Sequence, residues 1–176
     1  VVHDHLQPPE PAAGGLERFF SGLEPLEQAG KLGPVLWQLP ESFRRDDERL
    51  AAFLDALPPG RQCVELRHAS WFSLDVYALL REREAALVIA DHRERPFQAR
   101  ELTAGWTYVR FHYGDRLDGD YSDAALGEWA GRIGLWRRRA DVYAYFNNDW
   151  AIGRSAQSAA RYVRFAQSLA ERTIRA

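Results

Sequence analysis

Five short apolar segments, all but the third followed by residues with helical spacing, constrain this chain more than any other feature of its sequence. The predicted strands are 35–39, 62–67, 85–91, 106–112 and 141–147, and the predicted helices are 16–29, 46–57, 70–83, 122–139 and 154–172. Strands that alternate with helices are joined by right-handed crossovers and form a parallel sheet. We therefore predict an α/β fold in a single domain that spans residues 1–176.

Side-chain alternation divides each predicted strand into an apolar and a polar face. In a flat, doubly wound sheet helices cover both faces, and the strands are almost wholly apolar. Here one face is repeatedly polar, which favours a barrel whose interior opens into a site at the carboxyl ends of the strands. The residues assigned to this face are Gln38, Glu65, Arg67, Asp91, Tyr108, Arg110, His112, Tyr143, Tyr145 and Asn147.

Five motifs in order along the chain carry a resemblance to a known family. They are KLGPVLWQLP (31–40), ELRHASWF (65–72), AD (90–91), YVRFHYG (108–114) and YAYFNND (143–149). The chain resembles the YecE-like family, domain of unknown function 72. The resemblance implies a partial TIM-type (β/α)₈ barrel in which these five βα units are strands four to eight and the first three strands are missing. It implies no settled activity. Because the chain also begins at Val1 and not at Met, we expect a truncated barrel.

The polar face supplies the candidate site. Glu65 and Asp91 are suited to act as acid and base, and His112 to transfer protons. Arg67 and Arg110 are suited to clamp a carboxylate or phosphate. The residues predicted to contact substrate are Gln38, Arg67, Trp71, Arg110, Asn147 and Asn148.

The function that these residues favour is an enzyme, of hydrolase or isomerase type, that acts on a small polar or anionic substrate. No glycine-rich dinucleotide motif follows a strand, so we expect no cofactor. Two alternatives remain open: a module that binds an anion or nucleotide without catalysis, and a purely structural layer of ion pairs. A metal held by Glu65, Asp91 and His112, with His3 as an additional candidate ligand, is a further variant, although two arginines on the same face would repel a cation.

Bulk properties narrow the range of partners and compartments. The net charge of −2 shows no excess of positive charge for binding nucleic acid, and no apolar run approaches the roughly 20 residues that span a membrane. Cys63 is the only cysteine, and its apolar surroundings in the sequence predict a core residue. A single cysteine is consistent with a reducing, cytoplasmic location. A barrel without its first strands has open edges, so we expect the chain either to be unstable alone or to self-associate. Asp115, Asp118 and Asp120 lack the closing Glu of a calcium loop, which favours a flexible lid.

Overall fold

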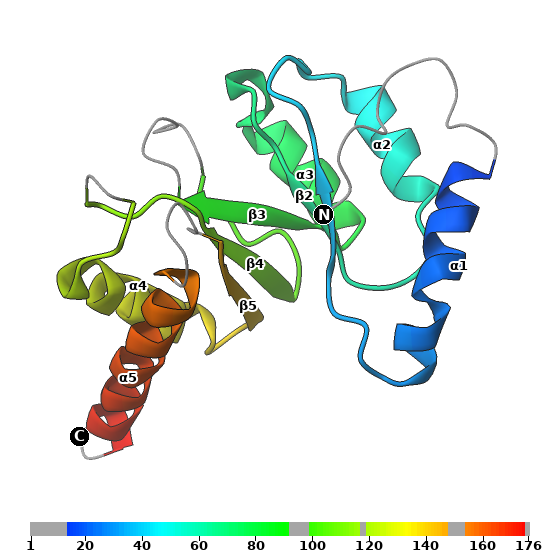
Figure 1. Ribbon diagram of the computed structural model, residues 1–176. Coiled ribbons are helices and arrows are strands. Elements are labelled where there is room, and N and C mark those ends of the chain that lie inside the picture. Colours follow the sequence, from blue (N-terminus) through cyan, green and yellow to red (C-terminus); the bar gives the residue numbers. More distant parts are fainter. Residues whose placement is uncertain (1–13, 92–98, 117–118, 148–153, 175–176) are drawn as a thin grey trace.

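The computed structural model describes residues 14–91, 99–116, 119–147 and 154–174, and its elements confirm the predicted α/β fold (Figure 1). Five parallel strands form one sheet in which the strands follow one another in chain order. The strands are β1 (Val35–Gln38), β2 (Gln62–Glu65), β3 (Ala86–Asp91), β4 (Trp106–Phe111) and β5 (Asp141–Phe146). The helices are α1 (Gly15–Gln28), α2 (Asp47–Asp55), α3 (Leu74–Glu82), α4 (Asp123–Trp136) and α5 (Arg154–Ile174).

The two largest hydrophobic clusters lie against the same face of the sheet. Val64 and Leu87 pair in register and pack with α2 and α3. Ile89 and Val109 also pair in register and pack with α4. Leu87 and Ile89 are two residues apart on β3, so they point to one face. Figure 1 shows α2 and α3 beside the β1 end of the sheet, and α4 and α5 beside the β5 end.

The opposite face of the sheet carries a third, smaller cluster. It consists of Leu36, Cys63, Ala86, Val88, Trp106 and Tyr108. Cys63 is fully buried there, which confirms that it is a core residue, and burial raises the pKa of its thiol. The predicted division of the strands into a helix-covered face and a second face is therefore confirmed on β2 and β4.

Contacts between distant strands show that the sheet curls toward this second face. Arg61, just before β2, forms an ion pair of 3.0 Å with Asp141 at the start of β5. Arg110 on β4 donates to Gln38 on β1 at 2.8 Å. In a flat sheet, β1 and β4 would lie three strand spacings apart, about 14 Å, and so would β2 and β5. We call the second face the concave face.

Side-chain caps determine where two of the helices begin. The Asp46 carboxylate accepts from the Arg49 amide at the start of α2, and the Ser122 hydroxyl accepts from the Ala125 amide at the start of α4. Each cap satisfies an amide that has no partner within its helix. The described residues contain no helix that is both long enough and apolar enough to cross a bilayer.

The helix predicted over residues 70–83 begins later than expected. Residues Ala69–Trp71 form a short 3₁₀ turn, and α3 begins only after Ser73. The Ser70 hydroxyl instead accepts from the main-chain amide of Arg45, which comes from the loop before α2.

Candidate functional site

Four of the predicted site residues meet on the concave face at the carboxyl ends of β1, β2 and β4. Glu65, the last residue of β2, accepts from Arg110 Nη1 at 2.5 Å and from Arg67 Nε at 2.9 Å. The same Arg110 nitrogen donates to Gln38 Oε1 at 2.8 Å. We call Gln38, Glu65, Arg67 and Arg110 the Glu65 cluster.

The Glu65 cluster is buried and carries an excess of positive charge. The side chains of Glu65, Arg110 and Arg67 are 3%, 9% and 18% exposed. One carboxylate faces two guanidinium groups, so the three side chains together carry one uncompensated positive charge. Among the described residues, Arg67 donates only through Nε and Arg110 only through Nη1. The remaining N–H groups of both arginines are therefore available to another acceptor.

Tyrosine rings lie next to the Glu65 cluster on the concave face. Tyr145 of β5 is in register with Arg110 and stacks on Tyr108, with ring centroids 4.7 Å apart. Burial raises the pKa of both hydroxyls, so both rings are neutral at physiological pH. Tyr145 remains 42% exposed and forms an open part of this surface.

His112 and Asn147 form a second polar contact beyond the last residues of β4 and β5. His112 Nδ1 lies 2.9 Å from the main-chain oxygen of Asn147 and 2.5 Å from its side-chain oxygen Oδ1. His112 is two residues beyond Arg110 and so lies on the same face of β4. Sequence reasoning placed both residues at the site but did not identify them as partners.

Asp91 does not join Glu65, and its predicted place on the concave face is wrong. It is two residues beyond Ile89 and pairs in register with Phe111, and both of these residues pack on the helix side. Burial raises the pKa of Asp91, while the nearby side chains of Tyr121 and Trp129 and the charge of Arg100 oppose this shift. Strand alternation therefore outweighs the tendency of a strand-end carboxylate to face the site.

Trp71 does not line the concave face, so its predicted role as a wall of the site is wrong. It is fully buried in the helix-side core with α2 and α3. Its indole N–H donates to the main-chain oxygen of Phe43 at 2.8 Å, and the two rings stack. The predicted site residue Asn148 and the candidate metal ligand His3 lie outside the described residues. In the described part of the chain, no group of three or more His, Cys, Asp or Glu side chains is arranged to hold a metal.

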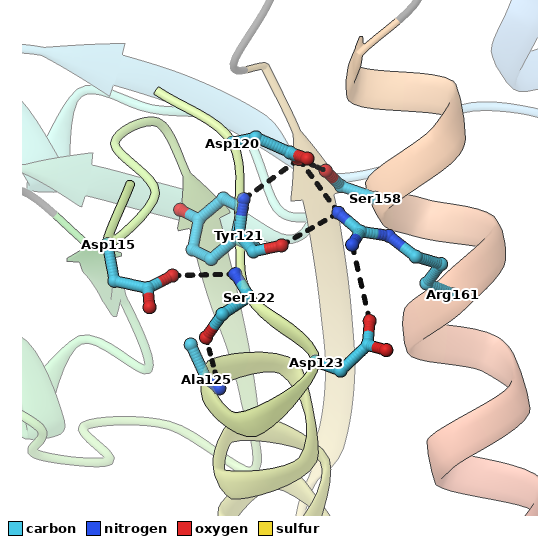
Figure 2. Close-up of polar contacts among 8 residues, drawn as sticks. All are labelled: Asp115, Asp120, Tyr121, Ser122, Asp123, Ala125, Ser158 and Arg161. Atoms are coloured by element: carbon cyan, nitrogen blue, oxygen red, sulfur yellow. Dashed lines mark hydrogen bonds and ion pairs between the residues drawn. The ribbon is translucent and has the colours of Figure 1, made fainter. Parts of the chain in front are cut away.

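The loop between β4 and α4, predicted to be a flexible lid, is fastened in its described part (Figure 2). Asp120 is 8% exposed, and its carboxylate accepts from Ser158 and Arg161 of α5 at 2.9 and 2.8 Å. Asp115 accepts from the Ser122 amide at 2.7 Å. Side-chain contacts therefore fasten residues 114–116 and 119–122 to each other and to α5, and the flexibility of this loop stays a prediction.

Comparison with known proteins identifies the family. The family model described as "Protein of unknown function DUF72" matches residues 3–175. The chain belongs to the DUF72 family. No curated protein matches the chain.

Solved structures of DUF72 proteins share the fold. A DUF72 family protein from Thermotoga maritima is 27% identical, with a TM-score of 0.74 over 88% of this chain. Two structures of a DUF72 family protein from Enterococcus faecalis, 19% and 21% identical, give TM-scores of 0.71 and 0.76. The chain spans 64% of the Thermotoga protein and 65% and 68% of the Enterococcus chains.

Proposed function

We propose that the five strands form part of an eight-stranded (β/α) barrel and that the concave face is its interior. Three features support this arrangement. The strands follow chain order, the helix clusters occupy one face, and the sheet curls until Arg110 on β4 reaches Gln38 on β1. About one third of each longer DUF72 chain lies outside the part that this chain covers, which leaves room for further strands.

We further propose that this interior binds a small anion, a carboxylate or a phosphate, at the carboxyl ends of the strands. The observation that carries the proposal is the buried Glu65 carboxylate, which holds two arginines whose charge it only half compensates. A guanidinium binds a carboxylate or phosphate through pairs of parallel hydrogen bonds. An anion that accepts from the remaining N–H groups of Arg67 and Arg110 would restore electrical neutrality in a place shielded from water.

The protein is, on this proposal, an enzyme of hydrolase or isomerase type. Arg67 and Arg110 bind the anionic group of the substrate, and Gln38 and Glu65 fix the position of Arg110. His112 supplies proton transfer, since an imidazole ring can accept a proton on one nitrogen and donate one from the other. Glu65 is less suited than His112 to exchange protons, because both of its oxygens already accept from arginines.

Titration with inorganic phosphate and with acetate, followed by NMR chemical shifts, tests the anion site. Binding should be weakened at least tenfold by Arg67→Gln, because a hydrogen bond to a charged group contributes about 1.5–3 kcal/mol. The matched control is Arg81→Gln on α3, whose exposed partner is Glu101. Equal affinities of the parent protein and the Arg67 variant would contradict the proposal.

A second measurement tests the proposed role of His112 in catalysis. His112→Gln should abolish turnover of any substrate found in a screen of phosphorylated and carboxylated metabolites, yet leave phosphate affinity unchanged. If a substrate is found and this variant keeps its full turnover, the proposed proton-transfer role of His112 is wrong.

A further inference from the structure

We propose that Asn147 is a positioning residue, which holds the His112 imidazole with its proton on Nδ1 and so makes Nε2 the basic nitrogen. The role of Nε2 in catalysis rests on the proposed function. The position of the proton does not.

Two oxygen acceptors surround the same ring nitrogen. The main-chain oxygen of Asn147 lies 2.9 Å from His112 Nδ1, and Oδ1 of its side chain lies 2.5 Å away. A carbonyl oxygen can only accept a hydrogen bond, so the nitrogen that faces it must donate. Turning the side-chain amide would exchange its oxygen and nitrogen, but the main-chain oxygen would still require a proton on Nδ1.

A neutral imidazole carries only one N–H. With the proton on Nδ1, the lone pair is on Nε2, which can then act as a general base. Where a histidine is used in this way, a partner on the other nitrogen fixes both the tautomer and the ring orientation. Here Asn147 supplies that partner twice, once from its main chain and once from its side chain.

The sheet holds the two residues in this relation. The Asn147 amide donates to the Phe111 main-chain oxygen at 2.8 Å, which extends the β4–β5 pairing one step past its last paired residues. The ring of Tyr113 packs edge-on against the imidazole, with centroids 4.7 Å apart and an interplanar angle of 87°. Backbone pairing and ring packing therefore restrict the imidazole.

The position of the imidazole relates it to the anion site. His112 and Arg110 share one face of β4, and two residues of a strand span about 6.6 Å. A substrate whose carboxylate is bound by Arg67 and Arg110 would place its next carbon atoms toward His112. Nε2 would take a proton from such a carbon, the electron pair would remain on the substrate as an enolate, and the guanidinium charges would stabilise it. Where the substrate carries a β,γ double bond, return of the same proton to the γ carbon would move the double bond to the α,β position and complete an isomerisation without any further reactant.

Long-range proton–nitrogen correlation spectra of uniformly ¹⁵N-labelled protein test the tautomer directly. The chain has five histidines, so loss of one set of signals in His112→Gln identifies the ring. At a pH where the ring is neutral, we expect a protonated Nδ1 and an unprotonated Nε2. Asn147→Ala removes one of the two acceptors and should lower the share of the Nδ1–H form without abolishing it, because the main-chain oxygen remains. Asn147→Asp, which retains a side-chain oxygen, should keep the parent's share of the Nδ1–H form.

The result that would overturn the inference is an Nε2–H ring in the parent protein, or a tautomer that is unchanged in Asn147→Ala. Circular dichroism establishes whether each variant is folded. If phosphate fails to bind while Nδ1 is protonated, the proposed anion site is wrong and the positioning contact stands. If phosphate binds and the ring is in the Nε2–H form, the anion site stands and the proposed positioning contact is wrong.

Discussion

At the scale of the residue, Glu65 is the only carboxylate among the described residues that contacts the guanidinium groups of Arg67 and Arg110. Glu65→Gln should lower the free energy of unfolding by about 3–5 kcal/mol, because it leaves two largely buried cations without their counter-charge. Urea denaturation measures this difference. The control is Glu128→Gln, which breaks an exposed pair with Arg132 on α4 and should cost no more than about 0.5 kcal/mol. Equal losses in the two variants would contradict the proposed importance of the buried cluster.

The stability that Asp91 contributes should change with pH in the opposite direction to the stability that a salt-bridged carboxylate contributes. Its pKa is raised in the folded protein, so the folded state holds the proton more tightly than the unfolded state. The stability that this residue contributes is present below the unfolded pKa and is lost as the pH rises through the folded pKa. Asp91→Asn, which mimics the neutral form, should therefore gain stability relative to the parent at pH 7 and lose that advantage at pH 3.

Urea unfolding at these two pH values checks the Asp91 prediction. Asp55→Asn on α2 removes a carboxylate that is 60% exposed and controls for the loss of one negative charge. If Asp91→Asn is less stable than the parent at pH 7 but matches it at pH 3, the ionised form is the one that the fold favours, and the prediction is wrong.

Single residues were predictable from the sequence only where strand alternation applied. Glu65 and Arg110 follow that alternation, and the structure brings them together. Asp91 was assigned by its place at the strand end, although its two-residue spacing from Ile89 already indicated the helix side. Trp71 could not be placed in this way, because its position depends on Phe43, a partner 28 residues away that belongs to a different loop.

At the scale of the element, the loop between β4 and α4 makes a prediction about two glycines. A Cβ atom on Gly114 would overlap the main-chain oxygen of Asp120, whereas nothing lies within 4 Å of the Cβ position on Gly134 of α4. Gly114→Ala should destabilise the protein by roughly 1–3 kcal/mol through this overlap. Gly134→Ala should stabilise it by roughly 0.5–1 kcal/mol, because alanine is the better helix former. Thermal unfolding of the two variants should thus show shifts of opposite sign, and a shift of the same sign in both would contradict the close approach of the two loop arms.

Strands were predicted closely from the sequence, while the connections between them were not. Each of the five predicted strands overlaps an observed one, because apolar runs that pack against helices leave a clear pattern. The 3₁₀ turn at Ala69–Trp71 and the anchored loop around Asp120 depend on contacts with Arg45 and Arg161, which are distant in sequence. Local patterns do not contain such contacts.

At the scale of the whole molecule, the curl of the sheet decides what the concave face can do. It brings Gln38 of β1 to Arg110 of β4, and Arg61 to Asp141, across strands that a flat sheet would hold apart. Sequence reasoning favoured a barrel from the repeated polar face and from the family resemblance. It could not supply the cross-strand distances on which the Glu65 cluster depends, since these follow from the curvature of the assembled sheet.

β5 is the last strand of the described sheet and pairs there only with β4, and this leads to a prediction for the 176-residue chain. In the described sheet β5 is an edge strand and its side chains are largely half-buried or exposed, whereas those of β4 are all buried. Edge strands with open backbone groups pair with other chains. Sedimentation velocity should therefore show concentration-dependent self-association. Tyr145→Lys should reduce it by placing a charge on β5, while Leu135→Lys, at a 60% exposed position on α4, should not. A monomer with a sharp, concentration-independent unfolding transition would contradict the open edge.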